Sequence, residues 1–152
     1  MDGASALSVR AGGKLIQRAD ILLVQSNEEV AVSWRNSLLD FGITLVRIAS
    51  SSTAALEAAR TVAPSCIVIA LPDLAEAFAL MGALTHDVTG RLRGIPILLV
   101  ARQPGRATLL TATHAGFDAV LAEPVSARQI YRRVASMIQR ARLSVRMQNV
   151  AE

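Results

Sequence analysis

Three short runs of apolar residues, each bounded by polar or turn residues, constrain the fold of this chain more than any other feature. They are Ile21–Val24, Cys66–Ala70 and Ile95–Ala101. An apolar run of strand length indicates a β-strand buried on both faces, as in a parallel sheet covered by helices. Ile43–Ile48 alternates and is rich in β-branched residues, and Ala119–Ala122 is short and apolar, so both predict further strands.

Segments with helical signals separate these strands. Asn27, a serine at position 51 or 52, and Ser126 stand where helix N-caps are expected, and Gly42 and Gly116 stand where helices would end. Strands that alternate with helices predict βα units and a parallel sheet. The predicted fold class is α/β: a flavodoxin-like (βα)5 doubly wound sheet with strand order 2-1-3-4-5, in three αβα layers.

The length of 152 residues suits one domain with short terminal additions. We expect a flexible arm over residues 1–18, the domain over residues 19–142, and a tail or helix extension over residues 143–152. No apolar run reaches the length of a membrane span, and residues 1–7 lack the basic and apolar regions of a signal peptide. We therefore expect a cytoplasmic protein.

Few residues suit metal or redox chemistry. Cys66 is the single cysteine, and neither His86 nor His114 has a second ligand at metal-binding spacing, so we expect no metal and no cofactor. Aromatic residues make up only 3% of the chain, which argues against binding single-stranded nucleic acid by stacking.

The net charge of +4 conceals an uneven distribution. Residues 19–87 carry three arginines against eight carboxylates, whereas residues 88–148 carry ten arginines against Asp118 and Glu123. A division of this kind indicates either an anionic partner or a self-complementary assembly.

Three segments resemble the receiver domains of bacterial response regulators. Residues 21–26 stand where the family has an apolar strand followed by two acidic residues, and residues 95–101 resemble its Ile-Pro-apolar strand. Residues 115–124 (Ala-Gly-Phe-Asp-Ala-Val-Leu-Ala-Glu-Pro) are similar to the family's Ala-Gly-Ala-x-x-Tyr-Leu-x-Lys-Pro, which is the most specific of the three. The resemblance covers about residues 20–142 and implies the receiver fold and a role in two-component signal transduction.

The positions that carry the chemistry of a receiver are altered here. The resemblance implies an acidic pair that holds Mg²⁺, a phospho-accepting aspartate, a hydroxyl residue, a lysine and a switch aromatic. At those positions, in that order, this chain has Gln25 and Ser26, Ala70, Ala101, Glu123 and Val120. Receivers usually hold the Lys-Pro bond cis, so the resemblance also implies a cis bond before Pro124.

The residues themselves argue against phosphoryl transfer. Mg²⁺ prefers hard oxygen ligands that include carboxylates. The cleft expected at the strand ends is small and neutral, lined by Gln25, Ser26, Ala70 and Ala101. Ala70 has no nucleophilic atom, and a carboxylate at Glu123 would repel the phosphoryl group that it faced. We therefore predict a pseudo-receiver that is not an enzyme.

Three nearby carboxylates are weaker candidates for the missing acidic groups. Asp73 lies three residues beyond Ala70, and Glu28 and Glu29 lie shortly after Ser26. A helix N-cap explains Asp73, and the first turn of a helix, about one turn too far from the cleft, explains the two glutamates.

Arginines dominate the predicted C-terminal helix. Residues 128–146 contain six arginines and no acidic residue. A solubilising face, a protein interface, and a surface for nucleic acid or anionic lipid all remain open as interpretations. In receivers the face formed by the fourth helix, fifth strand and fifth helix commonly serves dimerisation or effector contact. The resemblance therefore implies a partner surface, with Tyr131 directed toward the fifth strand, that comprises Arg106, Val120, Arg128, Tyr131 and Arg132.

Two functions from different classes follow. The leading hypothesis is a phosphorylation-independent signalling adaptor or regulator that contacts a protein partner or forms a homodimer. The alternative is a receiver-like transcription or RNA regulator that binds nucleic acid through the arginine-rich helix. A small-molecule sensor is a third interpretation, because ligands of such sheets bind at the carboxyl ends of the strands.

Overall fold

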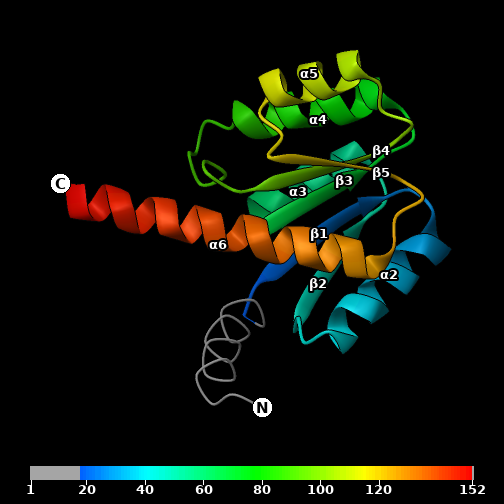
Figure 1. The fold of residues 1–152 in the computed structure, drawn as a ribbon, viewed down its shortest axis with the longest axis horizontal. Helices are drawn as coiled ribbons and strands as arrows, with labels where there is room; N and C mark the ends of the chain where they lie inside the picture. Colours follow the sequence, from blue (N-terminus) through cyan, green and yellow to red (C-terminus); the bar gives the residue numbers. More distant parts are fainter. Residues whose placement is uncertain (1–17, 152) are drawn as a thin grey trace.

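The computed structural model describes residues 18–151, so the arm predicted for residues 1–18 lies outside the described part except for Arg18. The elements, in chain order, are β1 (Asp20–Gln25), α2 (Glu28–Asp40), β2 (Leu45–Ala49), α3 (Ser52–Thr61), β3 (Cys66–Ala70), α4 (Leu74–Thr85), β4 (Ile97–Arg102), α5 (Arg106–Ala115), β5 (Ala119–Glu123) and α6 (Ala127–Ala151) (Figure 1). The strands form one parallel sheet in the order β2-β1-β3-β4-β5, which confirms the predicted flavodoxin-like fold. Within residues 18–151, no helix is both long enough and apolar enough to cross a membrane.

Helices cover both faces of the sheet and make three layers. α2 and α6 pack on one face, and α3, α4 and α5 pack on the other (Figure 1). Successive residues of β1 alternate between the two cores: Ile21 and Leu23 face α2 and α6, whereas Leu22 and Val24 face α3 and α4. All residues of β3 are buried. The apolar runs of the sequence therefore reflect strands that lose water on both faces.

Polar side chains fix where the helices begin. The side chain of Asn27 accepts a hydrogen bond from the N–H three residues on, at 3.2 Å, and Ser51 does the same at 3.1 Å. Ser51, the first of the two serines considered, is thus the cap of α3. Ser126 and Gln129 form a reciprocal capping box: the N–H of Gln129 donates to Ser126 Oγ at 3.2 Å, and the N–H of Ser126 donates to Gln129 Oε1 at 2.8 Å.

Two strands begin later than the sequence predicts. β2 begins after Ile43, because the N–H of Ile43 donates to the carbonyl of Leu38 at the end of α2 and is not available to the sheet. Ile43 is nevertheless 1% exposed and belongs to the core. β4 begins after Pro96, which has no N–H to donate to a neighbouring strand.

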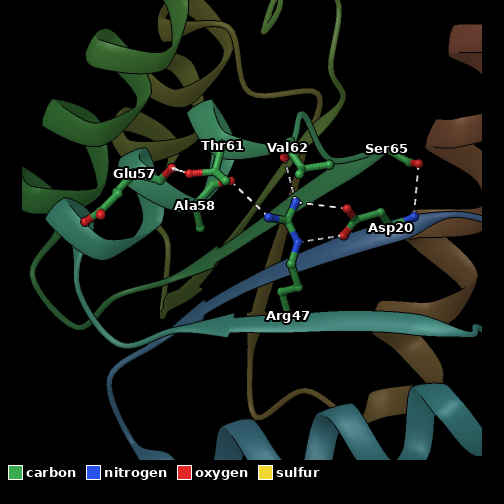
Figure 2. Close-up of polar contacts among 7 residues, drawn as sticks. All are labelled: Asp20, Arg47, Glu57, Ala58, Thr61, Val62 and Ser65. Atoms are coloured by element: carbon green, nitrogen blue, oxygen red, sulfur yellow. Dashed lines mark hydrogen bonds and ion pairs between the residues drawn. The ribbon is translucent and has the colours of Figure 1, made fainter.

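Arg47 of β2 connects two strands to the end of a helix (Figure 2). Its Nε donates to Asp20 Oδ1 at 3.0 Å, and its Nη2 lies 2.9 Å from Asp20 Oδ2. The same guanidinium donates to the carbonyls of Ala58 at 2.9 Å and Val62 at 2.8 Å. These carbonyls lie in the last turn and at the C-cap of α3; that of Ala58 also accepts the N–H of Val62 at 3.3 Å. One side chain therefore holds β1, β2 and α3 together.

Replacing Arg47 with methionine should lower the free energy of unfolding by about 2 kcal/mol, because it removes a charged donor from two carbonyls and from a carboxylate that is mostly shielded from water. The Asp20 side chain is 13% exposed and would lose its cation partner. Urea denaturation followed by the fluorescence of Trp34 measures the loss.

The matched control is Arg102→Met, because the Arg102 side chain is 86% exposed in its ion pair with Glu123. Exposed pairs contribute at most about 1 kcal/mol. An equal loss of stability in the two variants would show that the Arg47 contacts stabilise the fold no more than a surface pair does.

Candidate functional site

A cleft of about 890 Å³ opens at the carboxyl ends of the strands. Parallel strands bring their carboxyl ends to the same edge of the sheet, so residues far apart in the sequence meet there. All five predicted pocket residues line this cleft, and so does Pro124: the five are Gln25, Ser26, Ala70, Ala101 and Glu123.

The end of β1 presents an amide where a receiver has a carboxylate. Gln25 is 6% exposed and is paired in register with Ala70 on β3. Its Oε1 accepts the N–H of Asn27 at 3.0 Å, at the entry to α2. The amide thus orders the turn into the helix. Beside it, Ala70 is 5% exposed and offers only a methyl group to the cleft.

Opposite charges meet at the ends of β4 and β5. Arg102 and Glu123 are register partners, and Arg102 Nε lies 3.3 Å from Glu123 Oε2. Glu123 stands at the position where receivers have a lysine, and its carboxylate is paired with the cation of Arg102. The peptide bond between Glu123 and Pro124 is cis, which confirms that prediction.

The expectation of a small, neutral cleft is wrong. Besides the predicted residues, the cleft is lined by Glu29, Ser33 and Trp34 of α2 and by Arg102 of β4. α2 starts only three residues after β1 ends, so its first two turns form a wall of the cleft. Glu29, which we expected to lie a turn too far, therefore reaches it.

The residues of the predicted partner surface separate into two sets. Arg106 is exposed at the start of α5, Arg132 is exposed on α6, and Val120 of β5 packs against the core beneath α4 and α5. Tyr131 does not point toward β5 as expected, because its ring packs against Phe41 with centroids 5.1 Å apart.

Arg128 lies with Tyr131 on the side of α6 that faces Phe41. Its guanidinium carbon lies 5.9 Å from the centre of the Phe41 ring, at the end of α2. Arg128 and Tyr131 thus belong to the contact between α2 and α6. Their direction follows from the rotation of α6, which turns Ile130 and Val134 into the core.

Other titratable groups have structural roles. Asp73 caps α4, as interpreted from the sequence, and accepts the N–H of Ala75 at 2.9 Å. His86 Nδ1 lies 2.7 Å from the carbonyl oxygen of Gly82. Burial, together with the charge of Asp118, raises the pKa of the Cys66 thiol far above its ordinary value, so this thiol is protonated at neutral pH. Among the described residues, no three histidines, cysteines or carboxylates are grouped to hold a metal ion.

Comparison with known proteins finds matches for the fold but none for the sequence. No family model matches the sequence, and no curated protein matches it. Solved structures of response-regulator proteins do match the fold. The chemotaxis protein CheY4 of Vibrio cholerae aligns with a TM-score of 0.71 at 16% identity, over 79% of this chain and 98% of CheY4.

Two further solved structures also match the fold of this chain. The receiver domain of a signal transduction histidine kinase from Syntrophus aciditrophicus gives a TM-score of 0.68 at 17% identity, over 80% of this chain and 90% of that one. NtrX from Brucella abortus gives 0.76 at 18% identity, over 88% of this chain but only 29% of NtrX. The chain therefore has the fold of a receiver domain.

Trp34, the single tryptophan, lines the cleft and reports on its occupancy. MgCl₂ should leave its fluorescence unchanged, because an amide, a hydroxyl and a methyl group replace the carboxylates that bind Mg²⁺. The variant Gln25→Asp/Ser26→Asp/Ala70→Asp restores three carboxylates at this edge and should show a saturable fluorescence change. A saturable response of the unmodified protein would contradict this prediction.

Proposed function

We propose that this protein is a phosphorylation-independent signalling regulator, a pseudo-receiver that acts through contacts with a protein partner. One observation carries the proposal: the buried end of β3 presents Ala70, next to Gln25, at the place where a receiver has its phospho-accepting aspartate. The receiver fold supports the signalling class.

Phosphoryl transfer needs an oxygen nucleophile and cations that stabilise the transferred group. A methyl group at residue 70 supplies no nucleophile, and two carboxylates, Glu29 and Glu123, face the cleft. Arg102 supplies one cation, but it is already paired with Glu123. The proposed regulator therefore uses neither metal nor cofactor in this cleft, and its signal passes through its surface.

We place the partner surface over α5, β5 and the outer side of α6. Arg106 and Arg132 are exposed there, and Leu109 and Leu110 of α5 are 42% and 54% exposed. An apolar centre with charged residues at its rim is typical of a protein interface. The partner is a signalling protein or a second copy of this chain. Arg128 and Tyr131 pack near Phe41 at the contact between α2 and α6, so the surface we propose does not include them.

Incubation with acetyl phosphate and Mg²⁺, or with beryllofluoride and Mg²⁺, should change neither the mass nor the amide NMR spectrum of the protein. The physical reason is the absence of a nucleophile at residue 70 and of a carboxylate pair at residues 25 and 26. Mass spectrometry and ¹⁵N-correlated spectra measure the two effects.

An increase in mass by one phosphoryl group would overturn the proposal. Asp73→Asn is the control that locates such an adduct, because Asp73 is the carboxylate closest in sequence to Ala70. Loss of the adduct in this variant would assign a phospho-acceptor in the loop before α4.

A second candidate function is nucleic-acid binding by α6. It is favoured by the sequence of this helix, which contains six arginines and no acidic residue, and by the exposure of Arg132, Arg133, Arg140 and Arg142. Binding that depends on phosphate contacts weakens steeply with salt.

A gel shift with generic DNA and RNA separates the two candidates. The proposed regulator should give no shift even at low ionic strength. A shift that disappears in Arg140→Glu/Arg142→Glu, and that weakens with added salt, would favour the nucleic-acid function instead.

A further inference from the structure

An apolar groove of about 660 Å³ lies at the amino edge of the sheet, opposite the cleft of the receiver site. The loop before β4 forms one wall, and the middle of α6 forms the other. Its apolar lining comprises Ile95, Pro96, Ile138, Ala141 and Leu143. Neither the predicted pocket nor the proposed partner surface includes these residues.

α6 continues past the sheet at this groove (Figure 1). Ile138 is 3% exposed and packs in the core, whereas Leu143 is 58% and Met147 is 74% exposed. The helix nevertheless runs on to Ala151. A short helix without tertiary contacts is only marginally stable in water. Leu143 and Met147 are four residues apart and share one side of the helix, so they extend the apolar surface of the groove by a turn.

The charged residues that line the groove itself are arginines. Arg93 and Arg142 line it, and Arg140 lines the adjoining hollow. Asp118 also lines that hollow, but its Oδ2 accepts the N–H of Ile97 at 2.7 Å. The α6 sequence itself contains no acidic residue. The occupant that complements this surface is therefore apolar on one side and acidic beside it.

Two occupants from this chain fit less well. A second α6 would bring the same arginines against the first, and like charges in contact oppose association. β1 begins close to the groove, since the N–H of Asp20 donates to the groove residue Ser65. The sequence before it, residues 1–17, carries Arg10 and Lys14 against Asp2, so its net charge has the sign of the groove arginines.

We propose that this groove, with its continuation at Leu143 and Met147, binds an acidic amphipathic helix of a partner protein. The projecting part of α6 spans residues 139–151, about 20 Å at helical rise, which matches three to four turns of a partner helix. Apolar residues at i, i+4 and i+7 of that helix meet Ile138, Ala141 and Leu143, and its carboxylates meet Arg93 and Arg142. This inference rests on the proposed action through protein contact but uses a separate surface.

Fluorescence anisotropy with a defined probe tests the proposal. The probe is a labelled, side-chain-stapled helical peptide of about five turns, with leucine at i, i+4 and i+7 and glutamate on the flanking positions. The full-length protein should bind it saturably and more weakly as salt is added. Leu143→Asp and Arg93→Glu/Arg142→Glu should each weaken binding by about tenfold or more.

Matched controls separate the groove from other exposed residues. Leu39→Asp changes another exposed helical leucine, on α2, 39% exposed against 58% for Leu143, and Arg133→Glu reverses an exposed arginine about two turns before Arg140 on α6. Both variants should bind the probe as the unmodified protein does. A peptide with lysine in place of every glutamate should not bind.

Several results would overturn the proposal. They are absence of saturable binding, equal binding of the lysine peptide, or binding that Leu143→Asp leaves intact. A concentration-dependent dimer in light scattering that Leu143→Asp abolishes would assign the groove to a second copy. Tighter peptide binding by Leu15→Asp/Ile16→Asp would assign it to the N-terminal segment. None of these results bears on reactivity toward acetyl phosphate, so the two proposals fail independently.

Discussion

Burial of the central strands on both faces is the constraint on which the rest of the structure depends. β1, β3 and β4 are almost wholly apolar, and a parallel sheet of such strands is stable only when helices exclude water from both sides. Five βα units satisfy this requirement and fix the three layers. The polar groups that the layers bury are then paired locally. Gln25 is the buried case, and the half-buried Arg47 guanidinium likewise pairs with the carboxylate of Asp20 and the carbonyls at the end of α3.

The same topology gives the molecule two chemically different ends. The first turn of α2 and the end of β5 carry Glu29 and Glu123 into the cleft, whereas the loop before β4 and the middle of α6 bring arginines to the groove. A receiver uses the first end for phosphoryl chemistry. Here that end presents Gln25, Ser26 and Ala70 and has a cis bond before Pro124. The fold alone therefore does not decide the function, which depends on the residues placed at this end.

α6 contributes residues both to the proposed partner surface and to the apolar groove. Its first three turns are held by the capping box at Ser126 and by Ile130, Val134 and Ile138 in the core. Beyond Ile138 the same helix leaves the sheet with exposed leucine and methionine among arginines. Anchoring in the core orders one end of the helix, which lowers the conformational entropy cost of ordering the projecting half. The anchored half and the projecting half thus have separate physical roles within one element.

The sequence by itself determined the fold class, the strand order and the altered pocket. These depend on local patterns: apolar runs of strand length, capping residues such as Asn27, and the identity of residues 25, 70 and 123. It did not determine the directions of Arg128 and Tyr131 or the approach of Glu29 to the cleft. Those depend on how α6 rotates against the sheet and on how closely α2 follows β1. The groove at Ile95 and Leu143 could likewise not be predicted from the sequence, because a loop and a helix form it and only tertiary packing brings them together.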